Sequence, residues 1–160
     1  MSDDSRVSAQ LDEGHEITTK KLDTKRLGEM AEMAFILKAT SLGLTPSRPY
    51  GERRPYDFLL ECGSRVLRIQ VKSVHYSRPQ NRRAYTLNVC QHKDRGRAAY
   101  TPDDIDFVVA YVAPHDTWYV IPVDVLSHST NINVYPTGKR RTDGGLFEIY
   151  REAWHQLHSQ

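Results

Sequence analysis

The sequence predicts an α/β domain in which about five to six strands lie between an N-terminal helix and a C-terminal helix. Apolar residues recur at helical spacing near both ends of the chain, whereas apolar or alternating runs of strand length occupy the middle. The 160 residues suffice for one hydrophobic core, and 39% apolar with 26% charged residues is typical of a folded soluble protein. We therefore expect one domain over residues 23–160, preceded by a flexible polar tail at residues 1–22.

The N-terminal helix is expected to begin at Asp23 or Thr24, because either side chain can accept hydrogen bonds from the free N–H groups of the first turn. Gly43 is expected to end it, since glycine tolerates the left-handed conformation that follows many helices. Apolar residues at helical spacing predict a stripe that faces the core, formed by Leu27, Met30, Ala31, Ala34 and Leu37.

Residues 56–61 and 66–74 are two apolar runs separated by a turn at residues 62–64, which predicts a β-hairpin. Residues 84–90 are a third predicted strand. The continuous apolar run at residues 107–113 predicts a strand covered on both faces. Further strands are expected at residues 118–123 and 131–135. The closing helix is predicted over residues 147–157, with Phe147, Tyr150, Trp154 and Leu157 at core spacing.

A membrane-spanning protein is excluded by the pattern of apolar residues. The longest uninterrupted apolar run, residues 107–113, has seven residues, whereas a membrane span needs roughly 18 or more. The amino terminus has no basic-then-apolar signal pattern, so we expect a soluble cytoplasmic protein.

Basic residues are concentrated in the middle of the chain. Residues 38–97 contain thirteen Lys and Arg against four Asp and Glu, whereas residues 1–23 contain three basic and six acidic residues. This asymmetry predicts a surface that faces a polyanion; the alternative is that the basic residues only solvate loops. Arg48, Arg53 and Arg54 lie shortly before Asp57 and are expected to border the cut. The residues expected to contact nucleic acid are Arg53, Arg54, Arg78, Arg82, Arg83, Lys93, Arg95 and Arg97.

Five polar side chains combine in a pattern suited to phosphodiester hydrolysis. Asp57 opens the first strand of the hairpin, and Gln70 follows 13 residues later. Gln70 and Lys72 point to one face of the second strand because side chains alternate. Glu29 and Glu32 lie three residues apart on the helix, and either can reach the metal that Asp57 would bind. Such a cation activates water and neutralises phosphate charge, and a nearby lysine can orient or deprotonate the water.

Each of these residues also has a purely structural interpretation. Asp57 could accept backbone hydrogen bonds at the start of a strand. Gln70 and Lys72 could belong to a solvated strand face, and Glu29 and Glu32 to a solvated helix face. The combination, more than any single residue, favours a nuclease.

Three segments resemble the PD-(D/E)xK nuclease superfamily: GEMAE at residues 28–32, RPYDFLL at residues 54–60 and RIQVKS at residues 68–73. The similarity is strongest to the branch of group I intron-encoded homing endonucleases, and archaeal Holliday-junction resolvases are more distantly similar. The resemblance runs from about Lys25 to Val125. It implies a restriction-endonuclease-like core with a mixed sheet.

The resemblance also implies roles for individual residues. Asp57 would bind the metal, Lys72 would be the catalytic lysine, and the backbone carbonyl of Val71 would be a further metal ligand. Glu32 matches the helix glutamate of the family by its spacing from the glycine that opens the first segment, and Glu29 is the alternative.

Gln70 departs from the Asp or Glu that is usual in the superfamily. Its amide still offers an oxygen ligand but removes one negative charge from the metal site. Glutamine at this position resembles the intron-endonuclease branch, so it is compatible with catalysis. A helix glutamate becomes more necessary if the site is to keep two carboxylates.

The sequence therefore predicts a Mg²⁺-dependent endonuclease, with Mn²⁺ able to substitute, that cuts double-stranded DNA at a specific sequence as homing endonucleases do. Two alternatives stay open: a resolvase of Holliday junctions or other branched DNA, and a catalytically silent DNA-binding module of the same fold. By analogy with the family we expect a homodimer or homotetramer.

Overall fold

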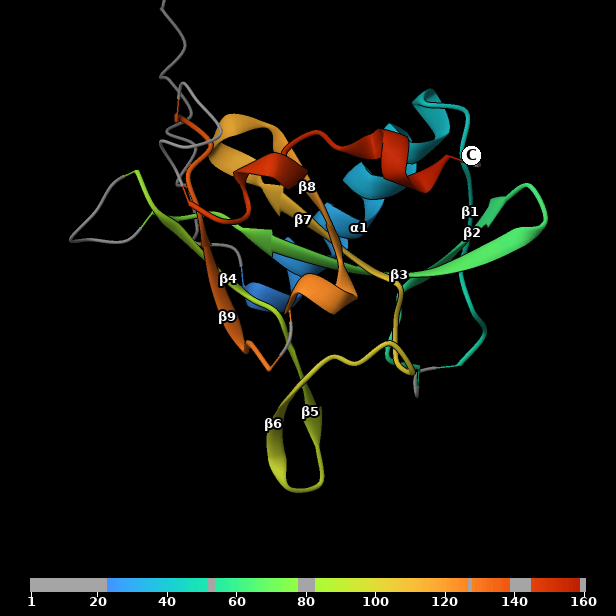
Figure 1. The fold of residues 1–160 in the computed structure, drawn as a ribbon, viewed down its shortest axis with the longest axis horizontal. Helices are drawn as coiled ribbons and strands as arrows, with labels where there is room; N and C mark the ends of the chain where they lie inside the picture. Colours follow the sequence, from blue (N-terminus) through green and yellow to red (C-terminus); the bar gives the residue numbers. More distant parts are fainter. Residues whose placement is uncertain (1–22, 52–53, 78–82, 127, 139–144, 159–160) are drawn as a thin grey trace, which may run out of the picture.

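A five-stranded mixed sheet is the framework of the computed structural model (Figure 1). Its strands, in spatial order β1-β2-β3-β7-β8, are Thr45–Ser47, Phe58–Cys62, Arg65–Val74, Phe107–Val112 and Thr117–Pro122. β3 and β7 pair in parallel, whereas the other neighbours pair antiparallel. The predicted α/β class and mixed sheet are confirmed, and the predicted hairpin is β2 with β3. The short edge strand β1 was not predicted.

The structure describes residues 23–51, 54–77, 83–126, 128–138 and 145–158. The predicted tail at residues 1–22 lies outside the described residues, as do Arg53, Arg78 and Arg82. No helix within the described ranges is long and apolar enough to cross a membrane.

Helix α1, Thr24–Ser41, has the predicted ends. The Asp23 side chain caps it by accepting a hydrogen bond from the backbone N–H of Arg26 at 2.7 Å. Gly43, just beyond the helix, has a φ of 78°, a left-handed conformation that glycine adopts without strain.

The predicted core-facing stripe of α1 is wrong for two of its five residues. Met30 is 43% exposed and Leu37 is 74% exposed, and the buried residues are Ala31, Phe35 and Ala39. The apolar side chains of α1 are distributed around most of its circumference, so their spacing alone does not select one buried face. The choice comes from packing: the Phe35 ring lies 5.0 Å from the ring of Phe58 in β2.

Buried clusters lie on both faces of the sheet at its central strands. Val109 of β7 packs in the cluster with α1, whereas Val108 and Ala110 belong to a second cluster on the opposite face. The second cluster includes the antiparallel pair β4, Tyr85–Asn88, and β9, Asn131–Val134. The prediction that the run at residues 107–113 is covered on both faces is confirmed.

The β5–β6 hairpin projects from the rest of the structure (Figure 1). It consists of β5, Cys90–Lys93, and β6, Gly96–Ala99. The single strand predicted at residues 84–90 is therefore two strands, β4 and β5, separated at Val89. The reason is a change of partner, because the chain pairs with β9 before Val89 and with β6 after it.

The predicted C-terminal helix over residues 147–157 is not present. Two short 3-10 helices, η3 Glu148–Tyr150 and η4 Trp154–Leu157, occupy this segment. They are separated because Arg151 forms a β-bridge with Tyr119, and the backbone N–H of Glu152 donates to the carbonyl oxygen of Trp118 at 2.8 Å. Pairing with the free edge of β8 thus replaces helical hydrogen bonds. The predicted burial of Trp154 and Leu157 is nevertheless confirmed.

Candidate active site

The β2–β3 hairpin places Asp57 beside Gln70. Asp57 immediately precedes β2, and its backbone N–H donates to the carbonyl oxygen of Ile69 at 2.8 Å. Its carboxylate Oδ2 accepts hydrogen bonds from Gln70 Nε2 at 2.6 Å and from the backbone N–H of Val71 at 2.8 Å. Gln70 Nε2 also donates to the carbonyl oxygen of Val71 at 3.2 Å. Three of the predicted site residues therefore form one connected group.

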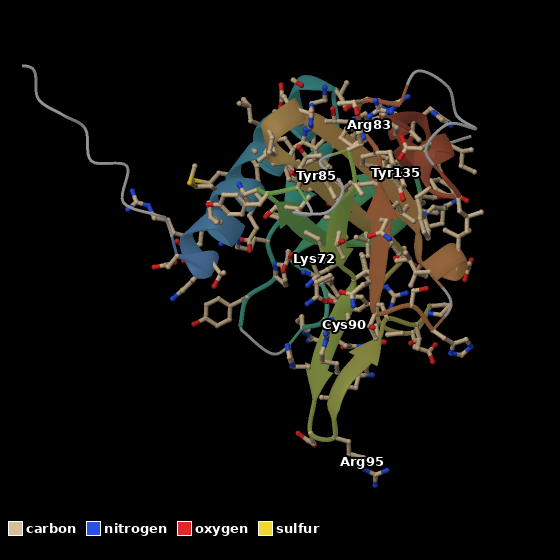
Figure 2. All side chains as sticks on the ribbon, turned by 90° about the vertical axis from the view of Figure 1, so that its left-hand side faces the viewer. Lys72, Arg83, Tyr85, Cys90, Arg95 and Tyr135 are labelled. Atoms are coloured by element: carbon tan, nitrogen blue, oxygen red, sulfur yellow. The ribbon has the colours of Figure 1, made fainter. Side chains whose placement is uncertain are left out.

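Lys72 lies two residues beyond Gln70 on β3, and its ammonium stands over an aromatic ring. The Lys72 Nζ atom is 5.5 Å from the centroid of the Tyr100 ring. Burial lowers the pKa of Lys72, and the nearby Asp57 carboxylate opposes this shift. Gln70, Lys72 and Tyr100 line one cavity of about 520 Å³ together with Arg54. Cys90 lines the same cavity and lies near Lys72 in Figure 2.

Glu32 lies on the other side of Asp57, where α1 approaches the start of β2. Glu32, Asp57 and Arg54 line a second cavity of about 380 Å³. The Glu32 carboxylate forms an ion pair with the guanidinium of Arg48. Glu29, the alternative helix glutamate, is exposed on α1. Within the described residues the structure thus brings Glu32, and not Glu29, to a cavity shared with Asp57.

The environment of Asp57 favours its protonated form. Burial raises the pKa of Asp57 to about 6, and the Glu32 carboxylate acts in the same direction. The hydrogen bond from Val71 and the charges of Lys72 and Arg48 oppose the shift. Two carboxylates that share a small space repel each other, which is the state that a bound cation relieves.

The donor atoms at this site are all oxygens and fit a hard divalent cation. They are the carboxylates of Asp57 and Glu32, the side-chain amide of Gln70 and the main-chain carbonyl of Val71. Mg²⁺ and Mn²⁺ favour such carboxylate and carbonyl ligands. No group of three or more His, Cys, Asp or Glu residues suited to a metal occurs in the described part of the chain. Gln70, in the place of an acidic residue, leaves this group with two carboxylates.

The described basic residues of the predicted nucleic-acid surface lie in different surroundings. Arg54 lines both cavities. Lys93 lies 3.5 Å from Asp104, and Arg97 donates to Cys90 Sγ at 3.1 Å. Arg95 lies at the tip of the β5–β6 hairpin, far from the body of the protein (Figure 2). Arg83 is exposed at the start of β4.

Two contacts of the site were not predicted from the sequence. Arg48 was expected to border the cut, but its ion pair with Glu32 was not predicted. Tyr100 lies 28 residues after Lys72, and no local pattern links the two. Both contacts join elements that are distant in sequence, so no spacing rule could have found them.

A model of the PD-(D/E)XK endonuclease family matches residues 22–157. The chain belongs to this family. The fold of this PD-(D/E)XK endonuclease is similar to the solved structure of a bacterial homing endonuclease, I-Ssp6803I, with a TM-score of 0.70 and 33% sequence identity. The similarity covers 84% of this chain and 93% of that chain. No match was found among curated proteins. The predicted resemblance and the restriction-endonuclease-like class are confirmed, and the PD-(D/E)XK family assigns the chain to the nucleases.

Proposed function

We propose that the protein is a metal-dependent DNA endonuclease whose site consists of Asp57, Gln70, Lys72 and Glu32. The observation that carries this proposal is the connected group at the hairpin, where the Asp57 carboxylate contacts the Gln70 amide and the Val71 backbone. A half-buried lysine with a lowered pKa lies next to it. Such a combination of oxygen ligands and a nearby ammonium suits phosphodiester hydrolysis.

The residues have distinct roles in this proposal. Asp57, Glu32, the amide oxygen of Gln70 and the Val71 carbonyl hold Mg²⁺ or Mn²⁺, which when bound supplies an activated water and neutralises phosphate charge. Lys72 would orient the attacking water, and burial lowers the pKa of Lys72, the direction that favours proton transfer from that water. Glu29 is the less favoured metal ligand because it is exposed on α1.

Double-stranded DNA is the proposed substrate. Arg54 lines both cavities of the site, and the β5–β6 hairpin carries Lys93, Arg95 and Arg97, with Arg95 at its tip. Arginine and lysine bind phosphates, and a two-stranded ribbon has the width of the major groove. Arg83 belongs to the same proposed surface. Sequence-specific cutting is supported by the similarity to a protein described as a bacterial homing endonuclease.

A catalytically silent DNA-binding protein is the second candidate. It is favoured by the orientation of Gln70, whose amide nitrogen, and not its oxygen, faces the Asp57 carboxylate. Such a protein would bind DNA but leave it intact. The expectations of a dimer or tetramer and of activity on branched DNA remain predictions.

Cleavage assays separate these functions. Purified protein is incubated with supercoiled plasmid, linear DNA with a randomised insert and a four-way junction, in Mg²⁺, Mn²⁺ or EDTA. We expect discrete, metal-dependent products with wild type and with Lys25→Ala, an exposed lysine on α1 that serves as the matched control. Lys72→Ala should bind DNA but give no products. Binding without cleavage by wild type on every substrate would favour the silent protein, and cutting of the junction alone would favour a resolvase.

A further inference from the structure

Arg48 lines the cavity that Glu32 and Asp57 share. It follows the edge strand β1 and forms an ion pair with Glu32 of α1. Its guanidinium lies over the Phe58 ring, 5.3 Å from the centroid. The Arg48 side chain is 60% exposed, whereas that of Glu32 is 27% exposed. A solvent-accessible cation therefore neutralises a more enclosed carboxylate.

The positive charge of Arg48 stabilises the two carboxylates of the cavity while no other cation is bound there. Glu32 and Asp57 repel each other across the cavity, and Arg48 offsets that repulsion. A divalent cation bound by the same carboxylates would take over this role. Arg48 would then add a third positive charge to one carboxylate, which is unfavourable at short range. The guanidinium fork binds a phosphate as readily as a carboxylate.

We propose that Arg48 is an exchangeable counter-ion of the site, which leaves Glu32 when a divalent cation binds and then contacts a DNA phosphate. This inference rests on the proposed metal-dependent function. It adds Arg48 to the residues that bind substrate. Arg48 then has two alternative partners: Glu32 in the metal-free protein and a DNA phosphate once metal and DNA are bound. The ion pair and substrate binding are alternatives for the same guanidinium.

Calorimetric titration with Ca²⁺ and, separately, Mn²⁺ tests the exchange without any cleavage step. Compared with wild type, Arg48→Ala should bind the metal roughly two- to fivefold more tightly, as expected when a competing exposed ion pair is lost. Arg48→Lys should lie between the two. Arg54→Ala is the matched control, because Arg54 lines the same cavity; a general change of charge would alter both variants equally. Thermal melts of all the variants serve as the control for folding.

DNA binding in Ca²⁺, measured by gel shift, tests the second partner. Arg48→Ala should weaken it roughly two- to fivefold, with a smaller salt dependence. The exchange would be overturned if Arg48→Ala bound metal more weakly than wild type or equally well. It would also be overturned if Arg54→Ala tightened metal binding as much as Arg48→Ala does. Unaltered DNA binding would overturn the phosphate contact. If wild type and Asp57→Asn both give flat metal titrations, the proposed metal-dependent function fails first, and the inference falls with it.

Discussion

The amide nitrogen of Gln70 donates a hydrogen bond to Oδ2 of Asp57 over 2.6 Å. An acidic residue at position 70 would instead place two carboxylates in contact. The amide therefore stabilises the metal-free site, while the charge available to hold a cation is reduced by one. If the proposed metal site is correct, Gln70 thus lowers its affinity for a cation and stabilises the metal-free protein.

Replacing Gln70 with glutamate should lower the stability of the metal-free protein and raise its affinity for a divalent cation. Gln70→Glu is expected to lose on the order of 1–3 kcal/mol of stability in EDTA at pH 8, because an acceptor replaces the donor to Asp57. In Mn²⁺ the variant should recover this loss through tighter binding. Urea unfolding in EDTA and in Mn²⁺ measures both effects. Equal stability of Gln70→Glu and wild type in EDTA would show that the contact contributes nothing.

Asp57→Asn should stabilise the protein at alkaline pH. The raised pKa of Asp57, about 6 against 3.8, means that the folded state binds the proton more tightly than the unfolded state. Wild-type stability therefore falls as the pH rises from about 4 to about 6. Without metal, the free energy of unfolding of Asp57→Asn should exceed that of wild type by on the order of 1 kcal/mol at pH 8. This difference should vanish near pH 4. Thermal melts across this range test the sign; a gain that grows toward low pH would contradict it.

Tyr100 should position the Lys72 ammonium through its ring. Tyr100→Leu is expected to lower the cleavage rate roughly tenfold, because the cation–π contact is lost. Tyr100→Phe should retain most of the rate because it keeps the ring. DNA affinity should be the same in both variants. Single-turnover cleavage measures the rate, and equal losses in the two variants would assign the effect to the hydroxyl group.

Asp106 should stabilise the start of β7 against β3. It accepts hydrogen bonds from the Arg68 backbone N–H at 2.7 Å and from Arg68 Nε at 3.1 Å. Although burial raises the pKa of Asp106, these bonds outweigh it, and the net shift is downward. Its stabilisation is therefore present above the unfolded pKa and lost as the pH falls through the folded one. Asp106→Asn should cost about 1–3 kcal/mol at pH 7 and progressively less as the pH falls below about 4, as urea unfolding can show.

The hairpin arginines should differ in their effects on DNA binding and stability. Arg95→Ala, at the exposed tip, is expected to reduce the salt dependence of DNA binding by about one phosphate contact without loss of stability. Arg97→Ala should also lower stability, because Arg97 contacts Cys90 and Asn131. Binding at several salt concentrations and thermal melts separate the two. If Arg95→Ala and wild type showed the same salt dependence of DNA binding, the tip of the hairpin would not be part of the DNA interface.

Local patterns were sufficient for much of the fold. The cap at Asp23, the turn that joins β2 and β3 and the doubly covered strand β7 each depend on neighbouring residues or on simple alternation. The boundaries of α1 follow from capping and from glycine conformation, which act within a few residues. For the same reason, the spacing of Asp57, Gln70 and Lys72 along one hairpin was enough to group them.

Features that depend on distant partners were predicted wrongly or not at all. The terminal helix at residues 147–157 is replaced by two 3-10 turns because the edge of β8 offers better partners than the next turn of helix. The face of α1 that is buried was chosen by the ring of Phe35 against aromatic rings from three other elements.

The sequence by itself was enough to predict the family, the α/β class and the candidate site residues at the hairpin. The tertiary structure alone decided that Glu32 shares a cavity with Asp57, that Arg48 neutralises Glu32 and that Tyr100 lies beneath Lys72. Side-chain alternation and capping act over a few residues and leave a trace in the sequence. Charge pairing and ring contacts act over a few ångströms in space, between residues whose separation along the chain carries no signal.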